Sequence, residues 1–201
     1  QQVSKIYLDK HNAKIQSKTL SKIVSGIIGK KRLPTIILDS ENVLKNRHTF
    51  SARAAGIIGF SMFGREVFYG LDEQMDLKFN DMVAYIEKYR DSEILMYGFT
   101  FIIWLHFIKY LVDKNLKLDL SNCVLIHGGG FKKLASQDLT YSEFKGLLFR
   151  HAKISKVYDY YGMVEQTGSI LTECDHGHLH TNIFNNIFIR SVDDFSILGD
   201  D

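Results

Sequence analysis

The sequence predicts an α/β fold in which helices flank a mostly parallel β-sheet. Short runs rich in Val, Ile, Leu and Tyr alternate with longer segments whose apolar residues recur at helical spacing. Several short runs lack a polar face, which is typical of strands buried on both sides. The strand–helix–strand order then favours parallel pairing through right-handed crossovers.

Five runs are expected to form the strands of this sheet. They comprise residues 35–39, 65–71, 93–97, 122–126 and 156–160. The last part of the chain, 172–201, differs because it combines Gly177 and three asparagines with a β-like run at 186–192. A hairpin or small antiparallel addition to the sheet is expected there.

The helical patterns lie between and before these strands. They comprise residues 17–29, 49–63, 77–89, 100–114 and 141–152. Thr140 and Glu143 fit a capping box that opens the last of these helices. Residues 100–114 are apolar nearly all round, as in a buried helix.

The composition excludes several classes of protein. The 201 residues are 45% hydrophobic and 24% charged, an ordinary globular mixture. The 25 Lys and Arg residues against 23 Asp and Glu leave a net charge of +2, too balanced for a protein that binds nucleic acid through a basic face. Two cysteines, Cys123 and Cys174, do not make a disulfide framework, which favours a reducing, cytoplasmic location.

The membrane question concerns one apolar segment, residues 93–112. Glu93, His106 and Lys109 interrupt it, and Gly98 breaks the run. A membrane span needs ~20 apolar residues with few charges. We therefore interpret the segment as a strand followed by a buried helix. The start of the chain has neither the apolar core of a signal peptide nor a Met, so we interpret it as a piece of a longer protein.

The first motif that suggests chemistry is His127-Gly128-Gly129-Gly130, directly after the strand expected at 122–126. Three glycines at the carboxyl end of a strand let the backbone approach a ligand closely. The alternative is a tight turn that needs positive φ. The same string occurs in the oxyanion loop of lipase-like hydrolases, but the Gly-x-Ser-x-Gly elbow of those enzymes is absent here, which disfavours a hydrolase.

The second motif runs from Asp159 to Gly168, at the end of the strand expected at 156–160. The ring of Tyr161 offers a face on which a planar base can stack. Asp159 can accept a hydrogen bond from an exocyclic amine, and Glu165 can bind Mg²⁺, which prefers oxygen ligands. The alternative is a strand end with a core tyrosine and a solvated acid.

Together the two motifs resemble the adenylate-forming superfamily, which carries an Asp-x-Tyr-Gly-x-x-Glu signature one strand after a Gly-Gly loop. His-Gly-Gly-Gly-Phe-Lys-Lys at 127–133 and Tyr-Gly-Met-Val-Glu-Gln-Thr-Gly-Ser-Ile at 161–170 resemble the LuxE acyl-protein synthetases in particular. That group is similar to phenylacetate–CoA ligases, which share a string like Glu173-Cys174…Leu179-His180. The resemblance covers residues 90–200 well and the preceding part only in its α/β pattern.

The resemblance implies the core of the N-terminal domain of an adenylate-forming (ANL-type) enzyme. It implies that Tyr161 stacks on adenine and that Asp159 and the glycine loop lie at the edge of the base. It also implies that Glu165 is the catalytic residue that holds Mg²⁺ against the phosphates. The implied nucleotide-binding set is His127, Gly128, Gly129, Gly130, Asp159, Tyr161, Gly162, Met163 and Gln166.

The implied reaction joins a carboxylic acid, by resemblance a fatty acid, to ATP and gives an acyl-adenylate and pyrophosphate. The acyl group then passes to a thiol, which is a protein cysteine, a carrier or CoA, and in the synthetases onward to an acyl reductase. Such a reaction depends on positioning and on charge neutralisation rather than on a strong base. The alternatives are a CoA ligase of the phenylacetate type and a non-catalytic module, with or without zinc.

The sequence departs from the family pattern in one position and in its extent. Val164 stands where the family has Thr, so that Gln166, Thr167 or Ser169 would have to contact the α-phosphate. The phosphate loop of the family would precede residue 1, and its ribose-binding aspartate and catalytic lysine would follow residue 201. We therefore expect residues 1–201 to be the central nucleotide- and acyl-binding core of a longer enzyme, inactive by itself.

A third cluster suggests a metal. Cys174, His176, His178 and His180 would face one side of a regular strand, and both residue types bind zinc. Gly177 disfavours a regular strand, and a turn with solvated histidines is the alternative.

Other segments are less specific. Residues 52–64 and 99–110 either wall an apolar acyl pocket or belong to the core. Lys132 and Lys133 either attract phosphates or lie on a solvated face.

Overall fold

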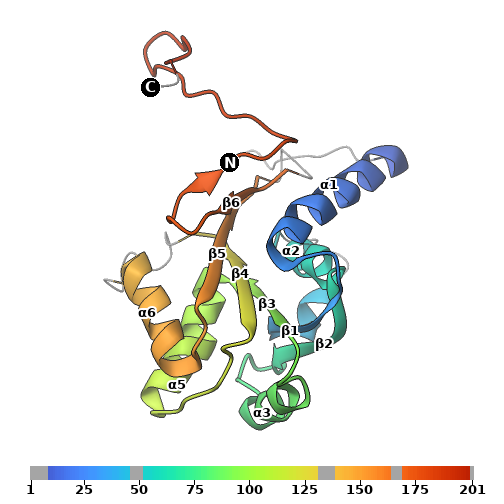
Figure 1. Ribbon diagram of the computed structural model, residues 1–201, viewed down its shortest axis with the longest axis vertical. Coiled ribbons are helices and arrows are strands. Elements are labelled where there is room, and N and C mark those ends of the chain that lie inside the picture. The colour runs from blue at the N-terminus through green and yellow to red at the C-terminus, as the bar shows by residue number, and fades with distance from the viewer. Residues whose placement is uncertain (1–8, 46–51, 131–138, 164–168, 200–201) are drawn as a thin grey trace.

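The computed structural model describes residues 9–45, 52–130, 139–163 and 169–199 (Figure 1). Within them, one sheet has the strand order β2-β1-β3-β4-β5-β6-β7. The strands are β1 (Leu33–Ser40), β2 (Gly64–Leu71), β3 (Ile94–Phe99), β4 (Cys123–Gly128), β5 (Lys156–Tyr161), β6 (Leu171–Glu173) and β7 (Leu179–His180). Strands β1 to β5 pair in parallel, and β6 and β7 add antiparallel to β5. The predicted fold class is confirmed.

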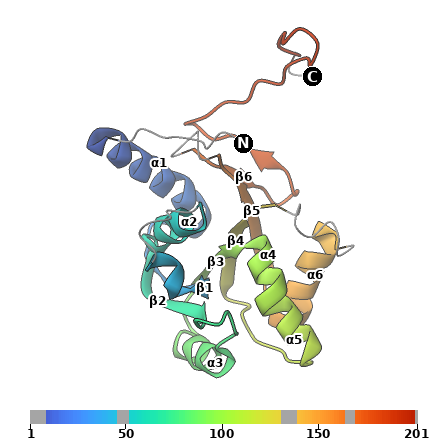
Figure 2. The ribbon, with the colours of Figure 1, turned by 180° about the vertical axis from the view of Figure 1, so that it is seen from behind.

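Helices cover both faces of the sheet (Figures 1 and 2). They are α1 (Lys10–Ile28), the short 3₁₀ helix η1 (Glu41–Leu44), α2 (Ala52–Ser61), α3 (Phe79–Lys88), α4 (Thr100–Ile102), the π-helical turn η2 (Ile103–Ile108), α5 (Lys109–Asp113) and α6 (Tyr141–Ala152). Helices α1 and α2 pack on one face. Helices α3, η2, α5 and α6 pack on the other face.

Alternation along the central strands builds the two halves of the core. In β3, Ile94 and Met96 face α3, α5 and α6, whereas Leu95 and Tyr97 face α1 and α2. All four side chains are fully buried. Because successive side chains of a strand point to opposite faces, a strand that is covered on both sides must be apolar throughout. This explains the unbroken apolar runs in the sequence.

The ends of two helices show how local sequence sets the boundaries. Thr140 and Glu143 form the predicted capping box at the start of α6. Helix α1 begins at Lys10 rather than at residue 17, because the Asp9 side chain accepts a hydrogen bond from the Asn12 amide and caps it. The first turns of α1 are largely exposed, and their polar residues gave no apolar periodicity.

The segment 93–112 forms β3 and then one continuous helix that runs through α4 and η2 into α5, as predicted. Phe107 and Ile108 are buried in the part of the core that lies between the sheet and helices α3, α5 and α6. No helix in the described parts of the chain is both long enough and apolar enough to span a bilayer.

A bulge interrupts the pairing of β1 with β2. Leu33 and Pro34 pair with Gly64 and Arg65, but Ile36 pairs with Phe68, so β2 carries one extra residue at this point. Within the bulge, Glu66 adopts a positive φ of 50°. An extra residue of this kind bends the strand and increases its twist.

The predicted antiparallel addition near the C-terminal end is confirmed, but residues 186–192 do not form one of its strands. The structure places the antiparallel addition earlier, in β6 and β7, and residues 181–199 follow it as a largely irregular segment that extends away from the sheet (Figure 1). Ile189 and Val192 are exposed. Among the described residues of this segment, β-pairing is limited to an isolated antiparallel bridge between Arg190 and Ile197. The run has strand-like composition, but no neighbouring strand pairs with it.

Candidate functional site

A cavity of about 450 Å³ opens at the carboxyl ends of β3, β4 and β5. Ligands of open α/β sheets bind at this edge. The lining residues are Ala52, Ala55, Gly56, Phe99, Gly129, Gly130, Asp159, Tyr160, Tyr161, Gly162, Met163 and Leu179. The cavity therefore brings six residues of the predicted nucleotide-binding set together with residues from both segments predicted as an acyl wall.

The backbone conformation and the close packing of the glycine loop after β4 leave no space for larger side chains at two positions. Gly129 and Gly130 have φ values of 93° and 64°, a region that favours glycine. A Cβ on Gly129 would stand 2.9 Å from the Phe99 ring, and one on Gly128 would overlap the Tyr160 ring. The sequence left open whether these glycines form a tight turn or expose the backbone to a ligand. In the structure they form a turn with positive φ, and this turn lines the cavity.

Two adjacent tyrosines at the end of β5 have different environments. Tyr160 packs against Phe60 and donates or accepts a 3.0 Å hydrogen bond with the Tyr97 hydroxyl. Tyr161 is 51% exposed beside the cavity. An aromatic ring with this much free surface at a cavity mouth suits stacking of a planar ligand.

The carboxyl group of Asp159 lacks a strong partner. Its Oδ1 atom is buried and accepts no hydrogen bond from the described residues. The Nδ1 atom of His127, on the neighbouring strand, lies 3.7 Å away. Burial, reinforced by the negative charge of Glu173, raises the pKa of Asp159 to about 6, although the Tyr160 amide and Lys145 act in the opposite direction.

Glu173 in β6 is the centre of a buried polar network next to Asp159. Its carboxylate accepts hydrogen bonds from the Asp159 amide at 2.8 Å, from Lys145 Nζ at 2.7 Å and from the Tyr141 hydroxyl. The Glu173 side chain is only 2% exposed. Burial would raise the pKa of Glu173, but the hydrogen bonds from Lys145 and Tyr141 outweigh it, so that the pKa is lowered and the carboxylate is ionised.

His127 lies beneath the glycine loop and does not line the cavity. Its ring is fully buried, and burial lowers its pKa to about 3, so the imidazole is neutral at pH 7. The Thr100 hydroxyl donates to the Gly128 carbonyl and lies 2.9 Å from His127 Nδ1. Because this hydroxyl has one proton, we assign the proton on Nδ1 to the bond with Thr100.

Several predicted residues fall outside the described parts of the chain. They are Lys132, Lys133, Val164, Glu165, Gln166 and Thr167. Ser169, one of the three candidates for phosphate contact, lies in a neighbouring cavity of about 440 Å³ that shares Tyr161, Gly162 and Met163 with the first.

The predicted zinc cluster does not form. Within the described residues, no three His, Cys, Asp or Glu side chains gather where one cation would bind them all. A turn between β6 and β7, closed by a 2.9 Å bond from the Gly177 amide to the Cys174 carbonyl, breaks the strand on which the four side chains would have shared one face. His180 Nε2 lies 3.2 Å from Cys174 Sγ, which leaves a pair and not a cluster.

Residues outside the predicted site set position the walls of the cavity. Asp39, at the end of β1, is buried and accepts two hydrogen bonds from Arg53 in the first turn of α2, one of them 2.6 Å long. This pair fixes the helix whose Ala52 and Ala55 line the cavity. An acid that ends an apolar strand was the available signal for Asp39. Glu173 stands in the string shared with phenylacetate–CoA ligases, but no local pattern pointed to Lys145.

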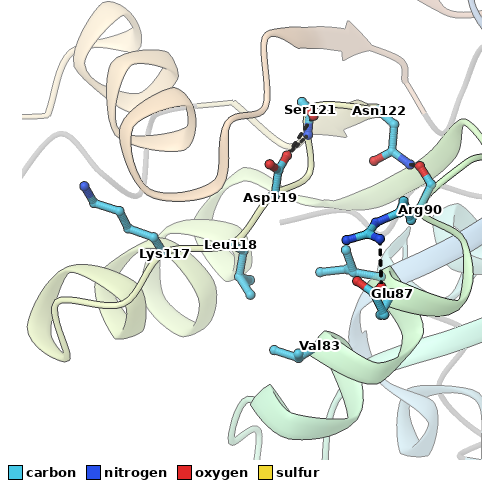
Figure 3. A pocket seen from close by; sticks show the side chains of 9 residues that line it. Val83, Glu87, Arg90, Lys117, Leu118, Asp119, Ser121 and Asn122 are labelled. Atoms are coloured by element: carbon cyan, nitrogen blue, oxygen red, sulfur yellow. Dashed lines mark hydrogen bonds and ion pairs between the residues drawn. The ribbon is translucent and has the colours of Figure 1, made fainter.

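Another pocket, of about 340 Å³, lies at the opposite, amino-terminal end of the strands, between α3 and the segment that precedes β4 (Figure 3). Two pairs of its polar groups contact each other: Arg90 lies 3.3 Å from Glu87, and Ser121 donates to Asp119. The Asn122 amide donates to backbone carbonyls at Tyr89, Arg90 and Ser92. We interpret this pocket as structural.

Comparison with known proteins agrees with the fold and the motifs. The family profile described as acyl-protein synthetase, LuxE, matches residues 2–199. The structure is similar to an open conformation of 2-hydroxyisobutyryl-CoA ligase in complex with 2-HIB-AMP and CoA, with a TM-score of 0.52 and 12% identity over 82% of this chain and 33% of that chain. Coronafacic acid ligase from Pectobacterium brasiliense is also similar, with a TM-score of 0.45 and 19% identity over 78% of this chain and 27% of that chain.

No curated protein sequence matches the chain significantly. At 12% identity the likeness to the first ligase concerns the fold alone. The chain spans about a third of the length of that ligase.

Proposed function

Because the chain belongs to the LuxE acyl-protein synthetase family, we propose that it is the nucleotide- and acyl-binding core of a ligase that activates a carboxylic acid with ATP. The observation that carries this proposal is the single cavity at the carboxyl ends of the strands. It joins the glycine loop, Asp159 and Tyr161 to the small residues of α2 and to Phe99.

The nucleotide part of the proposal rests on three features of the cavity. Tyr161 supplies an exposed ring for adenine, the Gly129–Gly130 backbone leaves space at the edge of the base, and Asp159 offers a carboxyl oxygen to the exocyclic amine. These residues fit a purine nucleotide in shape and in hydrogen-bonding capacity. We propose that Glu165 holds Mg²⁺, which neutralises phosphate charge when bound.

The acyl part rests on the apolar side of the same cavity. Ala52 and Ala55 have small side chains that leave room along α2, and Phe99, which packs beside Gly56, lines the same cavity. A Cβ on Gly56 would overlap the Tyr97 hydroxyl, so the helix needs a glycine to lie this close to β3. An apolar cavity next to a nucleotide site suits a carboxylic acid with a hydrocarbon chain, and we propose a fatty acid.

We propose that a thiol then receives the acyl group, either a cysteine in the remainder of the enzyme, a carrier or CoA, with an acyl reductase as the next protein. Cys123 is buried in the core, and the resemblance places the acceptor cysteine of the synthetases much later in the chain than Cys174, so neither is proposed as the acceptor. The remainder would also supply the phosphate loop and the catalytic lysine. Robust ATP–pyrophosphate exchange by residues 1–201 alone would contradict this division.

Calorimetric titration with a non-hydrolysable acyl-adenylate analogue and Mg²⁺ tests the proposal. Tyr161→Ala removes the stacking ring and should weaken binding by about 1–3 kcal/mol, or roughly 5–150-fold. Phe149→Ala is the matched control, since it removes another exposed aromatic ring, on α6 and outside the cavity. Equal affinities for all three folded proteins, or no binding by any, would argue against this site.

A further inference from the structure

We propose that Asp159 recognises the nucleobase as a neutral carboxylic acid, so that nucleotide binding takes up one proton from solvent. This inference rests on the proposed function, because it concerns the same base. In the described parts of the chain, the charged groups near the Asp159 carboxyl group are already paired with one another.

Among the described residues, Asp159 has no cation of its own. Lys145, the nearest ammonium group in the network, contacts Glu173 at 2.7 Å and lies over the Tyr141 ring, with 4.5 Å from Nζ to the ring centroid. His127 is neutral and directs Nδ1 to Thr100. Asp159 therefore faces the neutral imidazole of His127 on β4 and the carboxylate of Glu173 on β6. It also faces the ammonium group of Lys145 and the phenol of Tyr141 on α6, and both of these are hydrogen-bonded to Glu173.

Glu173 also fixes the backbone of Asp159. Its Oε2 accepts the Asp159 amide at 2.8 Å, which brings a second negative charge next to the Asp159 side chain. Two carboxylates in one buried region are not easily ionised together, and the one that accepts fewer hydrogen bonds takes the proton. Glu173 accepts three hydrogen bonds, whereas Oδ1 of Asp159 accepts none from the described residues.

A neutral carboxyl group matches the edge of adenine better than a carboxylate does. Adenine presents an amine donor at N6 beside an acceptor at N1. A carboxylic acid has one carbonyl acceptor and one hydroxyl donor, so it can satisfy both atoms, whereas a carboxylate has acceptors only and would oppose the N1 lone pair. A bound base also removes water from the cavity, which further favours the uncharged form.

The first experiment follows Asp159 without any ligand. The pKa of its side chain is measured by NMR titration of protein labelled with ¹³C in the aspartate carboxyl groups, with Asp159→Asn to assign the signal. Glu173→Gln removes the neighbouring negative charge and should lower this pKa, and Lys145→Gln removes the positive end of the same pair and should raise it. An unshifted pKa in the wild-type protein, or shifts of the same sign in both variants, would overturn the proposal.

The second experiment counts protons on binding. The acyl-adenylate analogue is titrated in two buffers of different ionisation enthalpy, over a range from about pH 5 to pH 8. Wild-type protein should take up close to one proton at neutral pH, and its affinity should fall up to ~10-fold per pH unit above the pKa of Asp159. Asp159→Asn carries a donor and an acceptor that do not titrate, so it should take up no proton and bind at neutral pH as tightly as the wild type does in acid.

An analogue in which carbon replaces adenine N1 should bind weakly and without proton uptake. Proton release, or affinity that rises with pH, would show that Asp159 acts as a carboxylate and would overturn the inference. Absence of binding at every pH would overturn the proposed function and the base recognition with it, while the NMR titration would still decide which form Asp159 takes in the free protein.

Discussion

The pockets at the two ends of the parallel sheet differ in how the polar atoms of their lining residues are satisfied. At the amino-terminal end, Glu87 pairs with Arg90, and the Asn122 amide binds backbone carbonyls. At the carboxyl end, Asp159 keeps a buried oxygen atom without a partner in the described chain, and Tyr161 exposes half of its surface. The pockets are similar in size, so the unsatisfied groups distinguish the candidate site better than its volume does.

The largest effect is expected from Glu173→Ala at the carboxyl end. It leaves Lys145 and the Asp159 amide without their acceptor, and loss of one partner of a largely buried ion pair should lower the free energy of unfolding by about 3 kcal/mol. Urea denaturation at neutral pH measures this loss. Glu87→Ala, which breaks an exposed ion pair at the other end, should have a much smaller effect. Equal losses in the two variants would remove the distinction between the ends.

Asp159→Asn should stabilise the free protein at neutral pH. Burial raises the pKa of Asp159 to about 6 in the folded state. Stability is therefore lost as pH rises from the unfolded value of about 3.9 through about 6, by roughly 2–3 kcal/mol in total. Asparagine does not titrate, so the two proteins should differ little near pH 4 and most above pH 7.

Denaturation curves at several pH values measure this difference. The lowered pKa of His127 destabilises both proteins in acid as pH falls from about 6.5 towards about 3, so it cancels in the comparison. A stability difference that does not depend on pH would contradict the assigned environment of Asp159.

The smallest effect is expected from Asn122→Ala at the amino-terminal end. The loss of its amide leaves carbonyl groups at Tyr89, Arg90 and Ser92 without this donor and should reduce the free energy of unfolding by about 1–2 kcal/mol. Affinity for the acyl-adenylate analogue should stay unchanged, because this residue lies at the far end of the strands. A folded Asn122→Ala protein that binds the analogue poorly would indicate that the two ends are coupled.

Much of the fold could be predicted because local sequence controls it. All five parallel strands lie where apolar runs indicated them, and α6 begins and ends as its capping box and periodicity predicted. The run at 186–192 misled because apolar β-branched residues indicate a strand only when a partner strand is available. The π-helical turn η2 gave no signal either, since its residues have an ordinary helical composition.

The candidate site was predictable in its motifs but not in its supporting contacts. Gly129, Gly130, Asp159 and Tyr161 share one cavity because the carboxyl ends of parallel strands meet at one edge. Glu173 reaches Asp159 only because β6 turns back antiparallel to β5, and Lys145 reaches it from α6. Contacts across elements depend on this packing, which no local pattern encodes.

The bulge in β2 has a consequence for solubility. β2 forms one border of the sheet, and an exposed border offers unpaired backbone groups to a strand from another molecule, which is a route to aggregation. The extra residue and the positive φ of Glu66 break the regular spacing that such a strand would need, and the charges of Glu66 and Lys88 lie at the same place. At the opposite border, β7 is only two residues long. Both borders of the sheet are thus poor templates for further growth.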